Sequence, residues 1–304
     1  MAGRDAPRFS SRQIIHFPRF AMKNTRYVTR TLYAALAVLV AATMAVPSAQ
    51  AQMYDEPLTS DRPGFSNAAA TLQQGAFQTE LGYSFANTAD VFGDESASSH
   101  NLGQLLLRYG VTDAFELRAN VGSYEYQEVL DPSLTNPSLT DPETTYEGGY
   151  FGPSVEAKAR LFRNETSTLS AFSSTLLPVQ TGFYDSNPDQ RAIQTLALLL
   201  DGQLGTGVSL TINGGTQFYW DGGVQEDRQF SALFIPTLNF AINDQVGAYV
   251  GYYGEYTEFA NTNFVEGGLT FLANENTQLD LNTGYRVDDN LDQFFIGLGL
   301  SQRF

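Results

Sequence analysis

The chain has 304 residues, no cysteine and a formal net charge of −16 at neutral pH. Without cysteine it can form neither disulfides nor thiolate metal sites, and so acidic a chain is a poor partner for nucleic acid, whose phosphates need a basic surface. The mean hydropathy of −0.21 does not exclude a membrane barrel, because only one face of each transmembrane strand meets lipid.

An apolar stretch near the N-terminus has the organisation of a secretory signal peptide. Residues 32–46 are apolar, basic residues precede them, and small residues follow up to Ala51. This order matches the charged, apolar and cleavage regions of a signal peptide, and the stretch is short for a membrane-spanning helix. We therefore expect residues 1–51 to be an N-terminal extension and signal peptide, with residues 1–21 an upstream over-extension of the reading frame.

Removal of this segment makes the remaining chain more acidic. Residues 1–51 hold seven of the 17 basic residues and one of the 33 acidic residues. The chain from Gln52 onward keeps 10 basic and 32 acidic residues, a net charge near −22. At this charge the exported chain is a still poorer partner for nucleic acid.

Residues 52–75 form an irregular lead that is rich in turn-forming residues and has no hydrophobic period. Two interpretations stay open for it. Asp61 and Arg62 are candidates for a plug that folds into a barrel, and the alternative is a disordered periplasmic tail.

From residue 76 onward, apolar and polar residues alternate in one segment after another, as they do in strands with one apolar face. The expected strands are residues 77–85, 103–109, 115–126, 150–161, 167–177, 192–201, 208–219, 230–240, 246–256, 264–272, 278–286 and 293–304. Short turns alternate with longer loops, which is typical of periplasmic turns and external loops. The sequence thus predicts an all-β fold, a single antiparallel transmembrane β-barrel of about 12 strands over residues 76–304, with both ends periplasmic.

The last strand strengthens this prediction. Phe294, Ile296, Leu298 and Leu300 share one face of it, and the chain ends on the aromatic Phe304. Outer-membrane barrels commonly finish on such a strand, so Phe304 is expected to act as an assembly signal for the barrel assembly machinery. A soluble β-sandwich or lipocalin-like barrel also alternates, but it buries apolar residues inside, whereas the inner face expected here is polar.

The alternation assigns charged side chains to the interior, because a charge on the lipid face costs about 2–4 kcal/mol at the midplane. The basic side chains expected on one wall are Arg108, Arg118, Lys158 and Arg160. The acidic side chains expected on the opposite wall are Asp201, Glu255, Glu266 and Asp280. Opposed walls of this kind would create a transverse field that orients a polar solute. An internal ion-pair network that includes Glu116 and Glu156 is an equally open interpretation.

No constellation of residues indicates catalysis. His100 is the one histidine after the signal peptide, it is expected at a loop–strand junction, and no serine is spaced to use it as a base. No calcium-loop spacing is present either. We therefore expect no enzyme activity, no cofactor and no metal site.

Two stretches resemble a known family. Thr59–Phe65 with Gln74–Tyr83, and then Leu107–Asp113, are similar to the opening and the next hairpin of the outer-membrane transporter family labelled putative MetA-pathway of phenol degradation. Ser60 stands where members of that family usually have threonine. The resemblance implies an outer-membrane channel for aromatic or other small hydrophobic compounds.

The expected function is therefore passive diffusion of small solutes through a polar, charged lumen in the bacterial outer membrane. The alternatives are a closed structural or adhesion barrel and, with less support, an outer-membrane enzyme. The expected partners are outer-membrane lipids, lipopolysaccharide and a small-molecule solute. The sequence specifies neither the solute nor the oligomeric state.

Overall fold

The computed structural model describes residues 57–90, 96–131, 143–179, 181–182, 192–220, 228–258, 260–288 and 291–304. The expected signal peptide and the start of the lead lie outside these residues. Within the described part of the chain, no helix is long and apolar enough to cross a membrane.

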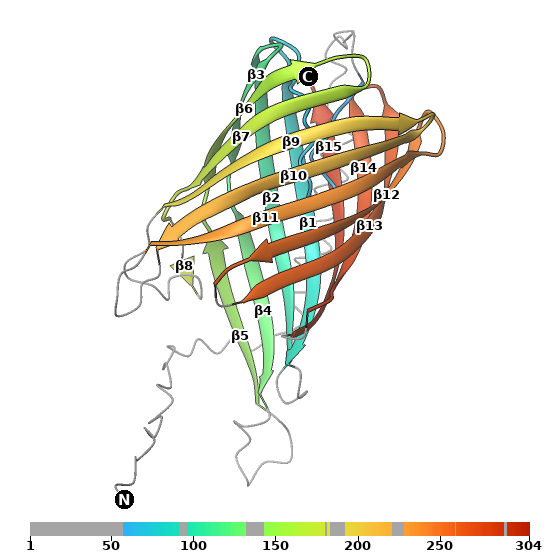
Figure 1. The fold of residues 1–304 in the computed structure, drawn as a ribbon. Coiled ribbons are helices and arrows are strands. Elements are labelled where there is room, and N and C mark those ends of the chain that lie inside the picture. The colour runs from blue at the N-terminus through green and yellow to red at the C-terminus, as the bar shows by residue number, and fades with distance from the viewer. Residues whose placement is uncertain are drawn as a thin grey trace, which may run out of the picture.

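The described strands form one antiparallel sheet that closes on itself, because β1 pairs with β15 on one side and with β2 on the other (Figure 1). The first strands are β1 (Phe77–Asp90), β2 (Ser96–Thr112), β3 (Phe115–Asn120), β4 (Ser123–Asp131), β5 (Glu143–Phe151), β6 (Ser154–Arg163), β7 (Ser167–Leu176) and β8 (Thr181–Gly182). The remaining strands are β9 (Ile193–Gly205), β10 (Val208–Trp220), β11 (Arg228–Ala241), β12 (Val246–Tyr256), β13 (Asn261–Asn274), β14 (Thr277–Arg286) and β15 (Leu291–Arg303).

These fifteen strands make a barrel of twelve, because three strands of the barrel are each divided into two parts: β3 with β4, β5 with β6, and β7 with β8. β2 pairs with β3 along its later residues and with β4 along its earlier ones, and β6 and β5 continue these two pairings. Gly122 separates β3 from β4 and has a φ of 92°, which glycine adopts without steric cost. Pro153 separates β5 from β6 and has no N–H to give to the ladder. The predicted twelve-stranded transmembrane barrel is confirmed.

The two faces of the barrel have the polarity of a membrane protein. Large apolar side chains are exposed on the outside, such as Val155, Leu198 and Val250, each of which is at least half exposed. Charged side chains lie inside, and Arg108 and Lys158 have no exposed surface. Closure pairs the sheet edges, which a bilayer requires because its core offers no hydrogen-bond partner to a free edge.

Both described ends of the chain lie at the end of the barrel that carries the short turns. We call it the short-turn end, and the opposite one the long-loop end. Phe304 donates its N–H to the carbonyl oxygen of Phe77 at 2.8 Å, and the two rings are 6.0 Å apart. Arg303 donates to the carbonyl oxygen of Pro57, the first described residue. The last strand, β15, therefore pairs with the first strand, β1, along its whole length.

His100 does not lie at a loop–strand junction as predicted. It lies within β2, pairs with Phe85 of β1, and contacts Tyr83 through a 2.8 Å hydrogen bond to the phenol oxygen. A register shift between Gly82 and Tyr83, next to Gly103 with its φ of 75°, changes which residues of β2 face outward. A bulge inverts the alternation of inward and outward residues beyond it. The alternation in the sequence therefore predicted only the part of this strand that follows the bulge and missed its beginning.

Candidate functional site

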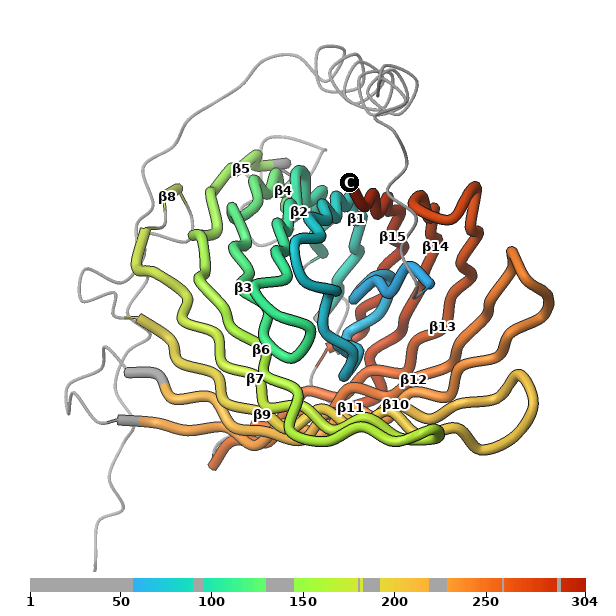
Figure 2. The backbone as a smooth tube through the Cα atoms, turned by 90° about the horizontal axis from the view of Figure 1, so that it is seen from above, coloured from blue at the N-terminus to red at the C-terminus, as the bar shows by residue number. Residues whose placement is uncertain are grey.

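Residues 57–75, which we call the lead segment, run through the interior of the barrel. Figure 2 shows this segment in blue inside the ring of strands. Its backbone is held by side chains of the wall: Asn213 accepts the N–H of Asn67, and Glu116 accepts the N–H of Leu72, at 2.6 Å and 2.8 Å. A segment without regular structure satisfies its buried backbone groups in this way.

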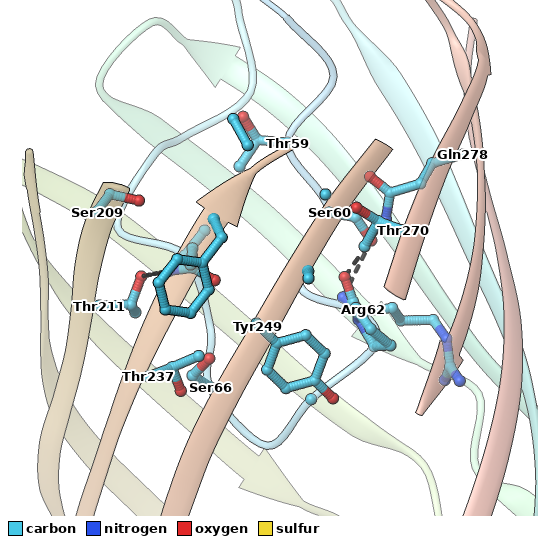
Figure 3. A pocket seen from close by; sticks show the side chains of 18 of the residues that line it. Thr59, Ser60, Arg62, Ser66, Ser209, Thr211, Thr237, Tyr249, Thr270 and Gln278 are labelled. Carbon is cyan, nitrogen blue, oxygen red and sulfur yellow. Dashed lines mark hydrogen bonds between the residues drawn. The ribbon is translucent and has the colours of Figure 1, made fainter. Parts of the chain in front are cut away.

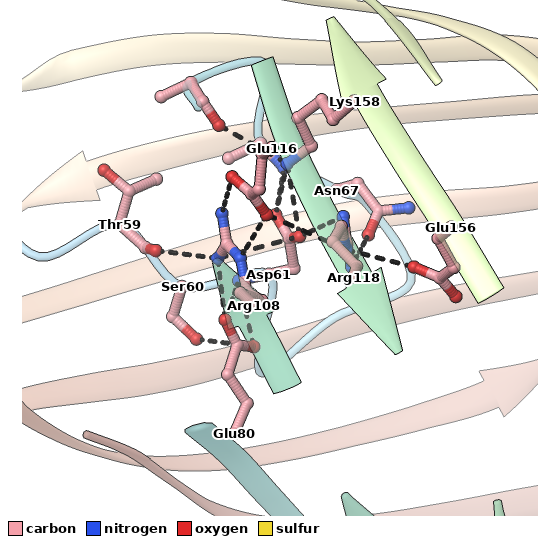
Figure 4. A network of polar contacts seen from close by, with 12 residues as sticks. Thr59, Ser60, Asp61, Asn67, Glu80, Arg108, Glu116, Arg118, Glu156 and Lys158 are labelled. Atoms are coloured by element: carbon pink, nitrogen blue, oxygen red, sulfur yellow. Dashed lines mark hydrogen bonds and ion pairs between the residues drawn. The ribbon is translucent and has the colours of Figure 1, made fainter. Parts of the chain in front are cut away.

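Asp61 is the centre of a buried ion-pair cluster (Figure 4). Its carboxylate oxygen Oδ2 lies 2.7 Å from Arg118 Nη1, 3.3 Å from Lys158 Nζ and 3.7 Å from Arg108 Nη1. The three cations come from β3, β6 and β2, which are neighbours in the sheet. Alternation on adjacent strands brings them to one patch of wall, and the lead segment supplies the anion between them.

Three acidic side chains of the wall complete this cluster. Arg108 lies 2.7 Å from both Glu80 and Glu116, and Arg118 lies 3.0 Å from Glu156. Four carboxylates therefore face three cations. Buried charges are tolerated when they are paired in this manner, and the arrangement is the ion-pair network that the sequence left open.

Burial alone would raise the pKa of the Asp61 carboxyl, but the positive charges of Arg108, Lys158 and Arg118 outweigh it and hold the pKa well below its ordinary value. The Ala68 N–H, which donates to Asp61 Oδ1 at 2.8 Å, lowers the pKa further. Asp61 is therefore ionised at neutral pH.

Arg160, the fourth basic residue expected on this wall, lies apart from the cluster. It is partly exposed and belongs to β6 near its end, two residues beyond Lys158. Among the described residues, no ion pair joins its guanidinium to a carboxylate. The structure thus brings together Arg108, Arg118 and Lys158 and leaves Arg160 outside this cluster.

The acidic residues expected on the opposite wall hold the lead segment as well. Asp280 lies 3.6 Å from Arg62 Nε. Glu266 accepts the N–H of Phe65 at 2.8 Å, and Asp201 accepts the N–H of Ala69 at 2.7 Å. Glu255 differs, since the hydrogen bond to it comes from Tyr253 on its own strand.

Residues 61–68 form a loop that we call the arch. Its two ends are joined by the hydrogen bond from the Ala68 N–H to Asp61. We call Asp61 and Ala69, the residue that follows the arch, its feet; both are buried. Compact loops with close ends are typical of functional surface loops, but this one stands inside a barrel. A Cβ atom at Gly64 would lie 2.7 Å from Glu266 Oε1, so the top of the arch touches the wall at β13.

Two cavities flank the arch. One, of about 360 Å³, lies toward the short-turn end and is lined by polar side chains of β10 to β14, among them Thr211, Thr237 and Gln278 (Figure 3). The other, of about 540 Å³, lies toward the long-loop end. Arg62, Pro63 and Gly64 line both cavities, so the arch is the partition between them.

The cavity toward the long-loop end contains an aromatic cluster that faces the interior. The ring of Phe65, from the arch, lies 4.8 Å from Tyr253, 5.4 Å from Phe295 and 5.7 Å from Phe264, measured between centroids. The three wall residues come from β12, β15 and β13, and all four rings line the cavity. Four rings thus gather at one place in a lumen whose other cavity is lined mainly by neutral polar side chains.

Sequence reasoning did not single out Phe65, Tyr253, Phe264 or Phe295 as members of a common site. One signal was available for Phe295, because it interrupts the polar parity of the last strand. Phe65 carries no such signal, since its partners are all more than 180 residues away along the chain. Among the described residues, no three His, Asp or Glu side chains are grouped so that they could hold a metal ion.

Comparison with known proteins agrees with this architecture. The crystal structure of the COG4313 outer membrane channel from Pseudomonas putida F1 superposes with a TM-score of 0.57 at 17% identity, over 80% of this chain and 99% of that one. The NanC porin gives a TM-score of 0.46 at 10% identity, over 73% of this chain and 98% of that one. No curated protein matches the sequence significantly.

The fold is thus that of outer-membrane barrels, and the sequence carries the family signature over nearly all of the described chain. The family described as Putative MetA-pathway of phenol degradation matches residues 60–304. This range begins in the lead segment and includes the whole barrel. The resemblance noted in the sequence is confirmed, and the chain belongs to the family described as Putative MetA-pathway of phenol degradation.

Proposed function

We propose that the protein is a channel of the bacterial outer membrane that passes small solutes by passive diffusion through its lumen. The observation that carries this proposal is the pair of cavities on the two sides of the arch, which share Arg62, Pro63 and Gly64 as lining residues. A solute would enter from the long-loop end, pass the arch and leave at the short-turn end. In this proposal the arch is a plug that narrows the path without filling it.

The proposed solutes are small aromatic or hydrophobic compounds. The larger cavity supports this, because it combines four aromatic rings with a few polar groups, as small-molecule sites commonly do. Membership of a family described by phenol degradation also supports it. The proposed mechanism needs no energy source, since a solute that binds weakly to a lining of mixed polarity can leave on either side.

A closed barrel with a structural or adhesive role is the second candidate. The buried cluster around Asp61 favours it, because this cluster fills the side of the lumen next to β2, β3 and β6 with paired charges. The two candidates differ in one respect. The channel needs a continuous path beside the arch, whereas the closed barrel needs none.

Conductance in planar lipid bilayers separates the two candidates. The channel proposal expects discrete steps from the refolded protein and, after subtraction of the uptake by protein-free liposomes, uptake that is faster for small aromatic alcohols than for sugars of similar mass. Protein that has been heat-unfolded serves as the control for leakage. A folded barrel that gives neither steps nor uptake would support the closed candidate instead. Fractionation of cells tests the location, and recovery as a soluble periplasmic monomer would overturn it.

A further inference from the structure

Phe65 occupies a pocket for a ring, which we call the aromatic box. The box consists of Tyr253, Phe264 and Phe295, and these three wall residues also contact one another, with centroids 6.5 Å and 6.0 Å apart for the pairs that include Phe264. Phe65 lies against all three at 4.8–5.7 Å. The tilted and edge-on orientations are those in which aromatic pairs attract one another.

Phe65 is held more weakly than the feet of the arch. It is only partly buried, and its side chain lines the cavity of about 540 Å³. Among the described residues, the hydrogen bond to its backbone is the one from its N–H to Glu266. The feet, by contrast, are fixed by the buried ion pairs of Asp61 and by the hydrogen bond of Ala69 to Asp201. The top of the arch is therefore held to the wall by fewer polar contacts than its feet.

The space for such a movement exists on both sides of the arch. The cavity of about 360 Å³ toward the short-turn end is lined by Gly64 and Ser66, the two neighbours of Phe65. The cavity toward the long-loop end gives a solute access to the box. It also contains Asn282, whose side-chain oxygen Oδ1 is buried and has no hydrogen-bond partner among the described residues.

We propose that the aromatic box is the solute-binding site of the lumen, that Phe65 is its resting occupant, and that a neutral solute with a single aromatic ring competes with Phe65 for it. Binding of the solute displaces the top of the arch and widens the path between the two cavities. This inference rests on the proposed channel function. It adds the site, the class of ligand and the way in which the ligand itself regulates the path.

The affinity of the box for benzyl alcohol tests the competition. Phe65→Ala removes the competitor, so we expect it to bind benzyl alcohol on the order of tenfold more tightly than the wild type, the effect of a few aromatic contacts. Phe295→Ala removes one wall and should weaken binding. Phe294→Ala is the matched control, because Phe294 is the next residue on the same strand but faces outward and is 43% exposed. Titration calorimetry in detergent micelles gives the affinities, and the Phe294→Ala protein corrects for uptake by the micelle.

Cyclohexylmethanol is the matched control ligand, since it has the size and hydroxyl of benzyl alcohol without the aromatic ring. Equal affinity for both ligands would overturn the proposal, and so would weaker binding by Phe65→Ala, which would make Phe65 a wall of the site and not its occupant. Absence of binding in every variant would overturn it too. Should Phe65→Ala fail to fold, as judged by heat-modifiable gel mobility, Phe65→Leu replaces it.

Conductance distinguishes failure of this inference from failure of the channel proposal. Benzyl alcohol should raise the conductance of the wild type, whereas Phe65→Ala should conduct more from the start and respond less. Cyclohexylmethanol controls for effects on the bilayer. A wild type that conducts but ignores benzyl alcohol would leave the channel proposal standing and refute the competition. A wild type that never conducts would refute the channel proposal, and the affinities would then decide the box on their own.

Discussion

Replacement of Asp61 by asparagine should destabilise the folded protein more than any other single removal of a carboxylate from the lumen. Among the described residues, Asp61 is the only carboxylate within 4.0 Å of Lys158 Nζ, at 3.3 Å, and Lys158 has no exposed surface. Arg108 keeps Glu80 and Glu116 after the change, and Arg118 keeps Glu156. The cost therefore falls mainly on Lys158, which loses its carboxylate partner and keeps the neutral carbonyl oxygen of Ala70.

The removal of one partner from a buried ion pair costs about 3–5 kcal/mol. We expect Asp61→Asn to lower the free energy of unfolding by this amount, and to increase hydrogen exchange in residues 61–72. Replacement of Lys158 by methionine in the same chain removes the unpaired charge and should recover part of the loss. The two changes should show a coupling energy of about 2–3 kcal/mol, near the upper limit for residues in contact.

Urea unfolding in lipid vesicles, followed by gel mobility, measures these differences. Glu255→Gln is the matched control, because Glu255 also faces the lumen but accepts its hydrogen bond from Tyr253 and not from the lead segment. Equal effects of Asp61→Asn and Glu255→Gln would refute the reasoning. So would a double variant that is no more stable than Asp61→Asn alone.

Three further outcomes are expected. Because the pKa of Asp61 is lowered in the folded protein, its contribution to stability is present above the ordinary value of 3.8 and is lost only as the pH falls through the lowered value. The protection factor of the Ala68 amide, which donates to Asp61, should therefore be the same at pH 7 and pH 5 after correction for the intrinsic pH dependence of exchange, and a lower protection factor at pH 5 would contradict the assignment. In bilayer recordings, Arg160→Gln should shift the reversal potential toward cation selectivity, and Glu255→Gln should shift it toward anion selectivity. Both shifts should shrink as the salt concentration rises, because the electric field of a charged side chain decays within about 10 Å at 0.1 M ionic strength. Replacement of the buried Lys158 should change stability far more than selectivity. Deletion of Phe304 should slow assembly, since it removes the hydrogen bond and ring contact with Phe77; unchanged heat-modifiable mobility after refolding would refute this role.

The sequence predicted the barrel because alternation is a local property. The alternation from Phe294 to Leu300 predicts a strand from these residues alone, whatever the rest of the chain contains. The cost of placing a charge in lipid then fixed the inward direction of Arg108, Arg118 and Lys158. The same reasoning could not find the bulge at Gly103, because a single inserted residue leaves no pattern of its own, and the start of β2 and the place of His100 were missed with it.

The site was less predictable, because it depends on contacts between distant parts of the chain. The inward side chains could be named, but their partners could not: the lead segment has no period that would place Asp61 between β2, β3 and β6. The opposed charged walls stay a prediction, since three of the four basic residues are paired in the cluster and only Arg160 remains apart from it. The aromatic box could not be predicted from the sequence for the same reason, because Phe65 contacts Tyr253, Phe264 and Phe295 only in the folded barrel.

The single-channel conductance of the wild type and of Arg62→Ala tests the central claim most directly. Arg62 lines the cavities on both sides of the arch, and its guanidinium crosses to Gln104 and to the carbonyl oxygen of Leu298. If solutes pass beside the arch, the wild type should conduct in small steps, and Arg62→Ala should conduct about twice as much or more because the narrowest part of the path has widened. Folded protein that gives no steps in either form, or steps of the same size in both, would contradict a path through this lumen beside the arch.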